Sequence, residues 1–303
     1  MNNQDIYYIH QGKPPTYLLR SMANTRAFNN NCRIFLLTEK HHLIPKYLNI
    51  ITRTFDELET SKHQTFLNEY KHLSKNSFSF ERFCFSRWFY LEAASRYNKS
   101  DIFAHLDSDC LIFDDMCNLE TLMLPSNTQY CYGINGAPHL ALFRNDISDL
   151  TTYMINSFKS DLYKNWQKSN FVDSNKNFCD MAVMIEFAKK VGSLHRGYLT
   201  DGNYVVEENM GIKEGYQIWS GPKHFKRVHW RIENSLLIPY LLTASQIYKR
   251  ALALHYKGSA KKRICSFNYP NQSKNICAVK KWFHNRVPPI NRWPIIKSKL
   301  GLG

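Results

Sequence analysis

The chain has 303 residues, of which 44% are apolar and 14% aromatic, a composition that excludes a disordered or fibrous protein and predicts a globule with a large core. Its net charge of +15 is unevenly placed: residues 221–303 hold 17 lysines and arginines against one acid, whereas residues 1–220 hold 23 against 24. We therefore expect a neutral body and a basic end, which would be attracted to polyanions or to an anionic membrane surface.

The first part of the chain predicts strands that alternate with helices. Residues 6–10 are β-branched and aromatic, and the glycine and prolines that follow predict a turn into a helix ending near Phe28. Residues 33–37 are continuously apolar, as in a strand of a parallel sheet covered on both faces. Residues 80–97 carry apolar side chains at helical spacing and predict a long amphipathic helix, whose polar face carries Arg82, Arg87 and Glu92.

The next strand leads into a pair of acids. Residues 102–106 are apolar and run into Asp107-Ser108-Asp109, and we expect the strand to continue through residues 110–113. Two carboxylates spaced i, i+2 point to the same side of an extended chain, so both can reach one divalent ion that also binds phosphate. Buried acids this close need a counter-charge. The alternative is a surface turn whose acids pair with lysine or arginine.

The remaining elements are shorter. We expect strands at 130–132 and 140–143 around a turn at Asn135-Gly136, a helix over 177–191, and late strands that include Val228 and residues 251–254. Acids vanish near Gly258, so we expect one domain over 1–263 and a basic, aromatic extension over 264–303. The eight cysteines contain no C-x-x-C pair, and we expect buried, reduced thiols.

A second motif follows the last predicted strand, where the chain reads H-x-x-G-x-x-K over His255, Gly258 and Lys261. An imidazole can complete a metal shell, a glycine lets backbone amides approach a diphosphate, and a lysine neutralises the leaving group. The alternative is a structural histidine. Paired with the acids, the motif favours a site for a metal and a diphosphate.

Together, the α/β opening, the helix with a central arginine, the D-S-D strand and the late H-x-x-G-x-x-K resemble the GT-A glycosyltransferases over about residues 5–263. The resemblance is closest to the retaining group that includes glycogenin and bacterial lipooligosaccharide galactosyltransferases. It implies a Rossmann-like α/β fold with a mixed, mainly parallel sheet and helices on both faces. It also implies that the basic C-terminal extension lies outside the catalytic domain.

The resemblance also implies roles for individual residues. Asp107, Asp109 and His255 would hold Mn²⁺ or Mg²⁺, and the nucleotide-sugar donor would be bound by His10, Gln11, Arg87, Asp107, Ser108, Gly258 and Lys261. Of these, His10 and Gln11 stand where such enzymes hold the base and ribose, and Gly258 and Lys261 would contact the diphosphate.

The chain departs from the pattern of the retaining enzymes at two places. Asp180-Met181 replaces the usual Asp-Gln beneath the donor sugar, and Lys262-Arg263 replaces the Pro-Trp after the motif lysine, so the stereochemical outcome stays open. Asp180, an acid at a predicted helix start, is our candidate for the catalytic acid that faces the sugar. A plain helix cap is the alternative, and the weaker rivals are Asp173 and Glu186.

The function expected from these features is a metal-dependent hexosyltransferase that moves a sugar from a nucleotide-diphosphate sugar, by family likeness a UDP-sugar, to a hydroxyl of a glycan or lipid-linked acceptor. The rivals are a non-catalytic nucleic-acid-binding protein that uses the basic end and a nucleotidyltransferase. The first residues lack the pattern of a secretory signal. We expect a cytoplasmic protein, peripheral at most at the inner face of the membrane, with no nucleic acid as partner.

Overall fold

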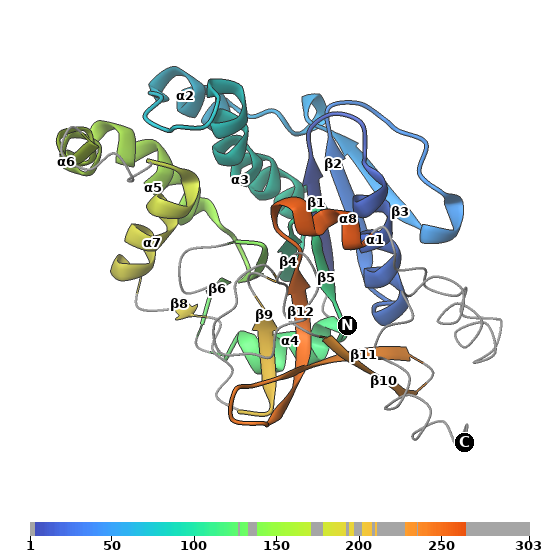
Figure 1. The fold of residues 1–303 in the computed structure, drawn as a ribbon. Helices are drawn as coiled ribbons and strands as arrows, with labels where there is room; N and C mark the ends of the chain where they lie inside the picture. The colour runs from blue at the N-terminus through green and yellow to red at the C-terminus, as the bar shows by residue number, and fades with distance from the viewer. Residues whose placement is uncertain are drawn as a thin grey trace, which may run out of the picture.

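The computed structural model describes residues 4–126, 128–132, 138–170, 178–191, 194–196, 202–207, 210, 228–234 and 236–264. The expectations for the turn at Asn135-Gly136, for Asp173 and for the extension after residue 264 fall outside these residues. The described chain forms two sheets that share no strand, with helices packed around the first (Figure 1).

The first sheet has seven strands in the order β3-β2-β1-β4-β7-β6-β8. Four of its neighbouring pairs are parallel, and β7 runs antiparallel to both β4 and β6. This confirms the expected mixed, mainly parallel sheet. Its strands are β1 (Gln4–His10), β2 (Arg33–Thr38), β3 (Ile50–Thr54), β4 (Ile102–Leu106), β6 (Tyr130–Tyr132), β7 (Leu140–Arg144) and β8 (Leu194–Arg196).

Helices cover both faces of this sheet. Successive side chains of β1 point to opposite faces and so pack against different helices. Tyr7 and Ile9 pack in the cluster that contains α3, whereas Ile6 and Tyr8 pack in the cluster that contains α1. The described helices are α1 (Thr16–Phe28), α2 (Ser61–Glu69), α3 (Phe78–Asn98), α4 (Met116–Met123), α5 (Ser148–Lys159), α6 (Asp161–Asn170), α7 (Asp180–Lys190) and α8 (Lys261–Ile264), with single 3₁₀ turns η1 (Lys46–Leu48), η2 (Asp56–Leu58) and η3 (Gly258–Ala260).

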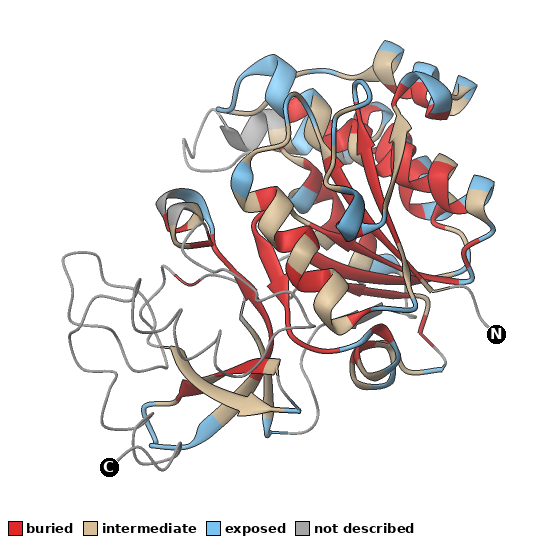
Figure 2. Ribbon diagram, turned by 90° about the vertical axis from the view of Figure 1, so that its right-hand side faces the viewer, coloured by how far each residue is buried: buried red, intermediate tan, exposed pale blue. Residues whose placement is uncertain are grey.

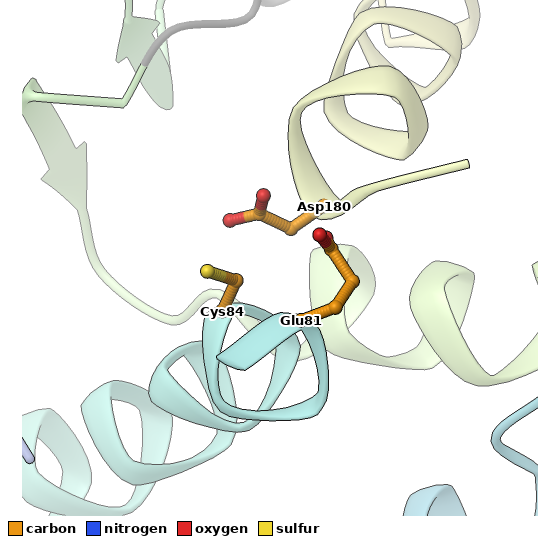
Figure 3. A group of neighbouring side chains, drawn as sticks. All are labelled: Glu81, Cys84 and Asp180. Carbon is orange, nitrogen blue, oxygen red and sulfur yellow. The ribbon is translucent and has the colours of Figure 1, made fainter. Parts of the chain in front are cut away.

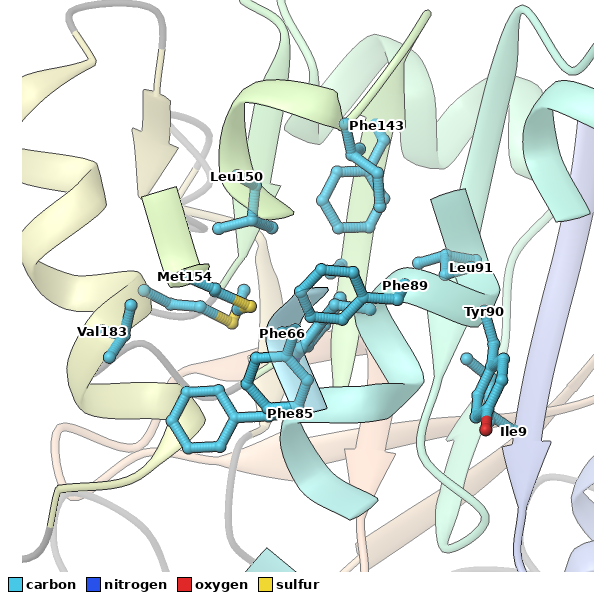
Figure 4. Packing of buried hydrophobic residues seen from close by; sticks show 14 of the residues in the cluster. Ile9, Phe66, Phe85, Phe89, Tyr90, Leu91, Phe143, Leu150, Met154 and Val183 are labelled. Carbon is cyan, nitrogen blue, oxygen red and sulfur yellow. The ribbon is translucent and has the colours of Figure 1, made fainter. Parts of the chain in front are cut away.

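Helix α3 lies against the sheet at the centre of the larger core. Ser77 caps its first turn by accepting a hydrogen bond from the Phe80 amide, and Trp88 is fully buried. Phenylalanines from α2 and α3 pack together with side chains of β7, α5 and α7 (Figure 4). Burial of each such side chain contributes about 1.5–3 kcal/mol, so α3 is a rigid support for the groups it carries. In Figure 2 the strands of the first sheet are mainly red, the colour of buried residues.

The second sheet corrects the predicted path of the chain after the acids. The order is β10-β11-β12-β5, and β9 pairs with β12. Instead of continuing β4, the chain turns at Asp107, and β5 leaves the first sheet to run antiparallel to β12 with Cys110 opposite His255. The strands are β5 (Cys110–Ile112), β9 (Tyr204–Glu207), β10 (Val228–Glu233), β11 (Leu236–Leu242) and β12 (Tyr248–His255).

Other details differ from the sequence prediction. Glu92 does not lie on an exposed polar face of α3, because it is buried and ion-paired to Lys62. Helix α7 begins at Asp180 rather than near residue 177. The six described cysteines are free, as expected, but only Cys110 and Cys131 are buried. Cys117 is exposed, and the other three are half-buried. Among the described residues, no helix combines the length and the apolar character needed to cross a bilayer.

Candidate active site

The two acids and His255 converge, although 146 positions separate Asp109 from the histidine. Ligand atoms of Asp107, Asp109 and His255 all lie within 4.8 Å of one another. The turn after β4 presents the acids, and the pairing of β5 with β12 brings the end of β12 beside them. The amide of Tyr256 donates a hydrogen bond to the Asp109 carbonyl at 2.9 Å, which fixes this junction.

Asp109 is the more buried acid, with its side chain 6% exposed. His255 Nε2 lies 3.4 Å from its Oδ1, and Lys261 Nζ lies 3.1 Å from its Oδ2. Burial lowers the pKa of Lys261, but the charge of Asp109 outweighs that effect and the pKa is raised overall. The lysine is therefore a charged partner of this carboxylate.

Asp107 is held by two basic residues of its own. Arg87 donates to its Oδ1 at 2.9 Å, and His105 Nε2 lies 3.4 Å from the same oxygen. Burial raises the pKa of Asp107, but Arg87 above all, with His105, brings it well below the usual range. Asp107 therefore carries a negative charge at physiological pH.

Arg87 joins the acid pair to Asp180. Its second guanidinium nitrogen donates to Asp180 Oδ2 at 2.7 Å, and Trp88 Nε1 donates to the same oxygen at 3.1 Å. Asp180 is the first residue of α7, and its Oδ1 accepts the amide of Met181 at 2.9 Å. Asp180 therefore bonds to an amide in the first turn of its own helix and, through Arg87, is connected to Asp107.

Two histidines of this site were missed by sequence reasoning. His105 precedes Asp107 by two residues, and the i, i+2 rule that pairs the acids would have placed it on the same side of β4. His139 has no such signal in the sequence. Its ring stacks on His255 at 4.5 Å with 6° between the planes, and its carbonyl accepts the Asp107 amide at 2.9 Å. Burial and then the charge of His255 lower the pKa of His139 to about 3, so it is neutral.

The residues expected to bind the donor's nucleotide and diphosphate lie at the end of β1, in the turn between the acids and just after β12. His10 ends β1 and is half-buried, and Gln11 after it is exposed. Burial lowers the pKa of His10, and the charge of Lys261 lowers it further. Ser108 lies half-buried in the turn between the acids. Gly258 has φ +61°, a left-handed conformation that glycine adopts without strain.

A second group of possible ligands, Glu81, Cys84 and Asp180, lies where the N-terminal end of α3 meets the start of α7 (Figure 3). Glu81 is buried, and its Oε2 accepts hydrogen bonds from Ser74 and Asn76 at 2.8 and 2.7 Å. Burial, and then the charge of Asp180, raise the pKa of the Cys84 thiol well above its usual range. Because metals bind the thiolate, and Asp180 already accepts three hydrogen bonds, we assign no metal to this group.

No family model and no curated protein matches the chain. Among solved structures it is similar to mouse xyloside xylosyltransferase 1 in its apo form, at 11% identity over 69% of this chain and 88% of that chain, with a TM-score of 0.43. An active-site mutant of LgtC matches at 11% identity over 94% and 98%, with a TM-score of 0.39. A cytidylyltransferase from Leptospira borgpetersenii matches at 10% identity over 48% and 61%, with a TM-score of 0.29. Because these TM-scores lie below 0.5, we base the functional proposal on the site's side chains.

Proposed function

We propose that the chain is a metal-dependent glycosyltransferase that moves a sugar from a nucleotide-diphosphate sugar, for which we take UDP-sugars first, to a hydroxyl of a glycan or lipid-linked acceptor. The observation that carries the proposal is the convergence of Asp107, Asp109 and His255, with Lys261 on one side and Arg87 on the other. Such a set offers ligands for a cation and a counter-charge for phosphate.

The position of this set in the sheet supports a nucleotide ligand. Strands β1 and β4 are parallel neighbours, and the chain leaves β1 toward β2 on one side while β4 lies on the other. Open α/β sheets bind ligands outside the carboxyl ends of the strands at such a reversal. Here those ends carry His10 and Gln11 on one strand and Asp107 on the other.

The donor atoms of the site fit a divalent cation. Two carboxylates and one imidazole are hard or borderline ligands that suit Mn²⁺ or Mg²⁺. The stacked, neutral His139 holds the His255 ring without adding a competing charge. When bound, the ion would bind diphosphate oxygens and stabilise the charge that develops on the leaving group.

The chain's own residues supply the remaining functions. Lys261 would neutralise the departing nucleoside diphosphate. Gly258, three residues before it, would let backbone amides approach the diphosphate, and its left-handed conformation suits glycine. His10 and Gln11 would contact the nucleoside. Asp180, held by Arg87 and Trp88, would face the sugar and position its reacting carbon for the acceptor hydroxyl.

Replacement of Asp109 by Asn tests the proposal, because the amide keeps the shape of the side chain and removes its charge. We expect Mn²⁺-dependent turnover of UDP-sugars to fall at least 100-fold while the melting temperature in EDTA is kept. Asp161→Asn is the matched control, since that carboxylate is 85% exposed and lies on α6. Undiminished sugar transfer by Asp109→Asn would remove the proposal. A wild type that leaves UDP-sugars intact but releases pyrophosphate from a nucleoside triphosphate and a sugar phosphate would favour a nucleotidyltransferase.

We also propose that the basic extension, which lies outside the described residues, binds an anionic membrane where a lipid-linked acceptor would be found. Its cations are interspersed with Trp282, Phe283 and Trp293. A chain truncated after Ile264, which keeps the whole of α8, should lose binding to vesicles that contain phosphatidylserine and keep its turnover of soluble donor. Equal vesicle binding by the truncated and full chains would contradict this role.

A further inference from the structure

Lys261 lies beside Asp109 and the ring of Tyr17. Its Nζ lies 3.1 Å from Asp109 Oδ2 and 5.2 Å from the centroid of the Tyr17 ring. The Asp109 side chain is 6% exposed, whereas that of Lys261 is 34% exposed. A partly exposed ammonium group therefore balances the charge of a buried carboxylate that we propose as a metal ligand.

A divalent cation on Asp109 would compete with this lysine. A divalent ion repels a neighbouring ammonium group twice as strongly as a single charge at the same distance would. The lysine can leave, because its four-carbon stem is flexible and its side chain is one-third exposed. Binding of the ion to Asp109 and departure of Lys261 should therefore be linked.

The side toward which Lys261 can move is the proposed nucleotide side. Tyr17 belongs to the first turn of α1, which follows β1, and the face of its ring attracts an ammonium group. The charge of Lys261 also reaches His10 at the end of β1. A diphosphate bound between His10 and the acids would lie within the range of this side chain.

We propose that Lys261 is a positioning residue that exchanges partners: it pairs with Asp109 until a cation binds there, and then moves to the diphosphate. This inference rests on the proposed function, which supplies the cation and the nucleotide. Its consequence is thermodynamic. The Lys261–Asp109 ion pair weakens binding of the cation alone, and the diphosphate removes that penalty, so the two ligands bind cooperatively and each strengthens the other by the same factor.

The experiment is a titration with Mn²⁺, followed by the electron paramagnetic resonance of the free ion, with and without UDP. We expect Lys261→Met to bind Mn²⁺ alone several-fold more tightly than the wild type, and the strengthening by UDP to shrink at least about fivefold. Lys257→Met is the matched control: it removes the same charge from an exposed position four residues away and should keep the wild-type coupling. Lys261→Arg should restore much of the coupling.

The opposite sign overturns the inference. If Lys261→Met binds Mn²⁺ alone as weakly as the wild type or more weakly, or keeps the full strengthening by UDP, Lys261 does not exchange partners. Lys261→Gln, which is polar and uncharged, should behave as Lys261→Met and guards against a folding defect. Failure of the proposed function looks different, because the wild type would then bind no Mn²⁺ with UDP present, or Asp109→Asn would bind it equally well.

Discussion

The two acids of the D-S-D turn have counter-charges of different kinds. Asp107 is paired with Arg87, which projects from the middle of the long helix α3, is 14% exposed and also binds Asp180. Asp109 is paired with Lys261, which begins the four-residue helix α8 and is 34% exposed. A planar guanidinium with two fixed partners is a structural link, whereas a flexible ammonium with one carboxylate partner is free to exchange. The site thus combines one permanent and one exchangeable cation.

Removal of Arg87 should have the largest effect on stability. Arg87→Met leaves Asp107 and Asp180 without their shared partner, and loss of one member of a buried ion pair costs about 3–5 kcal/mol. Lys261→Met removes one partner of a single carboxylate rather than the shared partner of two, and should cost less than Arg87→Met. Urea unfolding in EDTA measures both. Equal losses of unfolding free energy would show that the two cations do not differ as we describe.

Removal of the charge of Asp180 should affect turnover more than binding. Asp180→Asn keeps the side chain's shape at the start of α7 but weakens its bond to Arg87. We expect turnover to fall about 100-fold or more, the size seen when one group that stabilises a transition state is removed, with binding of UDP and Mn²⁺ unchanged. Glu186→Gln, on the same helix, is the control. An unchanged rate for Asp180→Asn would show that it serves only as a structural partner of Arg87.

The neutral histidine beside His255 predicts a smaller, pH-dependent effect. The pKa of His139 is lowered to about 3, so between about pH 6.5 and 3 the unfolded chain binds a proton that the folded chain does not. Stability should therefore fall on acidification, with a slope of at most about 1.4 kcal/mol per pH unit from this group. His139→Asn should flatten the pH dependence of unfolding in EDTA. The pKa of His105 is lowered too, so some slope should remain. A slope as steep as that of the wild type would contradict the buried, neutral state of His139.

Local patterns in the sequence predicted much of the first sheet and most of the proposed ligands. The runs at residues 6–10 and 33–37 and the helix with Arg87 could be read directly, because buried strands and amphipathic helices have their own periods. The two motifs predicted that Asp107, Asp109 and His255 would lie together, and their ligand atoms lie within 4.8 Å of one another. Their roles as ligands remain predictions.

Tertiary features could not be predicted in the same way. Residues 102–106 and 110–113 are equally apolar, so nothing local shows that β5 leaves the first sheet to pair with β12. Arg87 and Trp88 donate hydrogen bonds to Asp180, which lies 93 and 92 positions away on another helix. The stack of His139 on His255 joins the residue before β7 of the first sheet to the last residue of β12 of the second. Such contacts follow from strand order and register, which the periods of single segments do not contain.

The most direct test of the site is spectroscopic detection of the proposed histidine ligand. Mn²⁺ bound to the wild-type chain with UDP should show hyperfine coupling to an imidazole nitrogen in electron spin echo experiments, because His255 would coordinate the ion beside Asp107 and Asp109. The coupling should disappear in His255→Asn and persist in His105→Asn. Nitrogen coupling that survives in His255→Asn, or bound Mn²⁺ without any such coupling in the wild type, would contradict a single ion shared by the three residues.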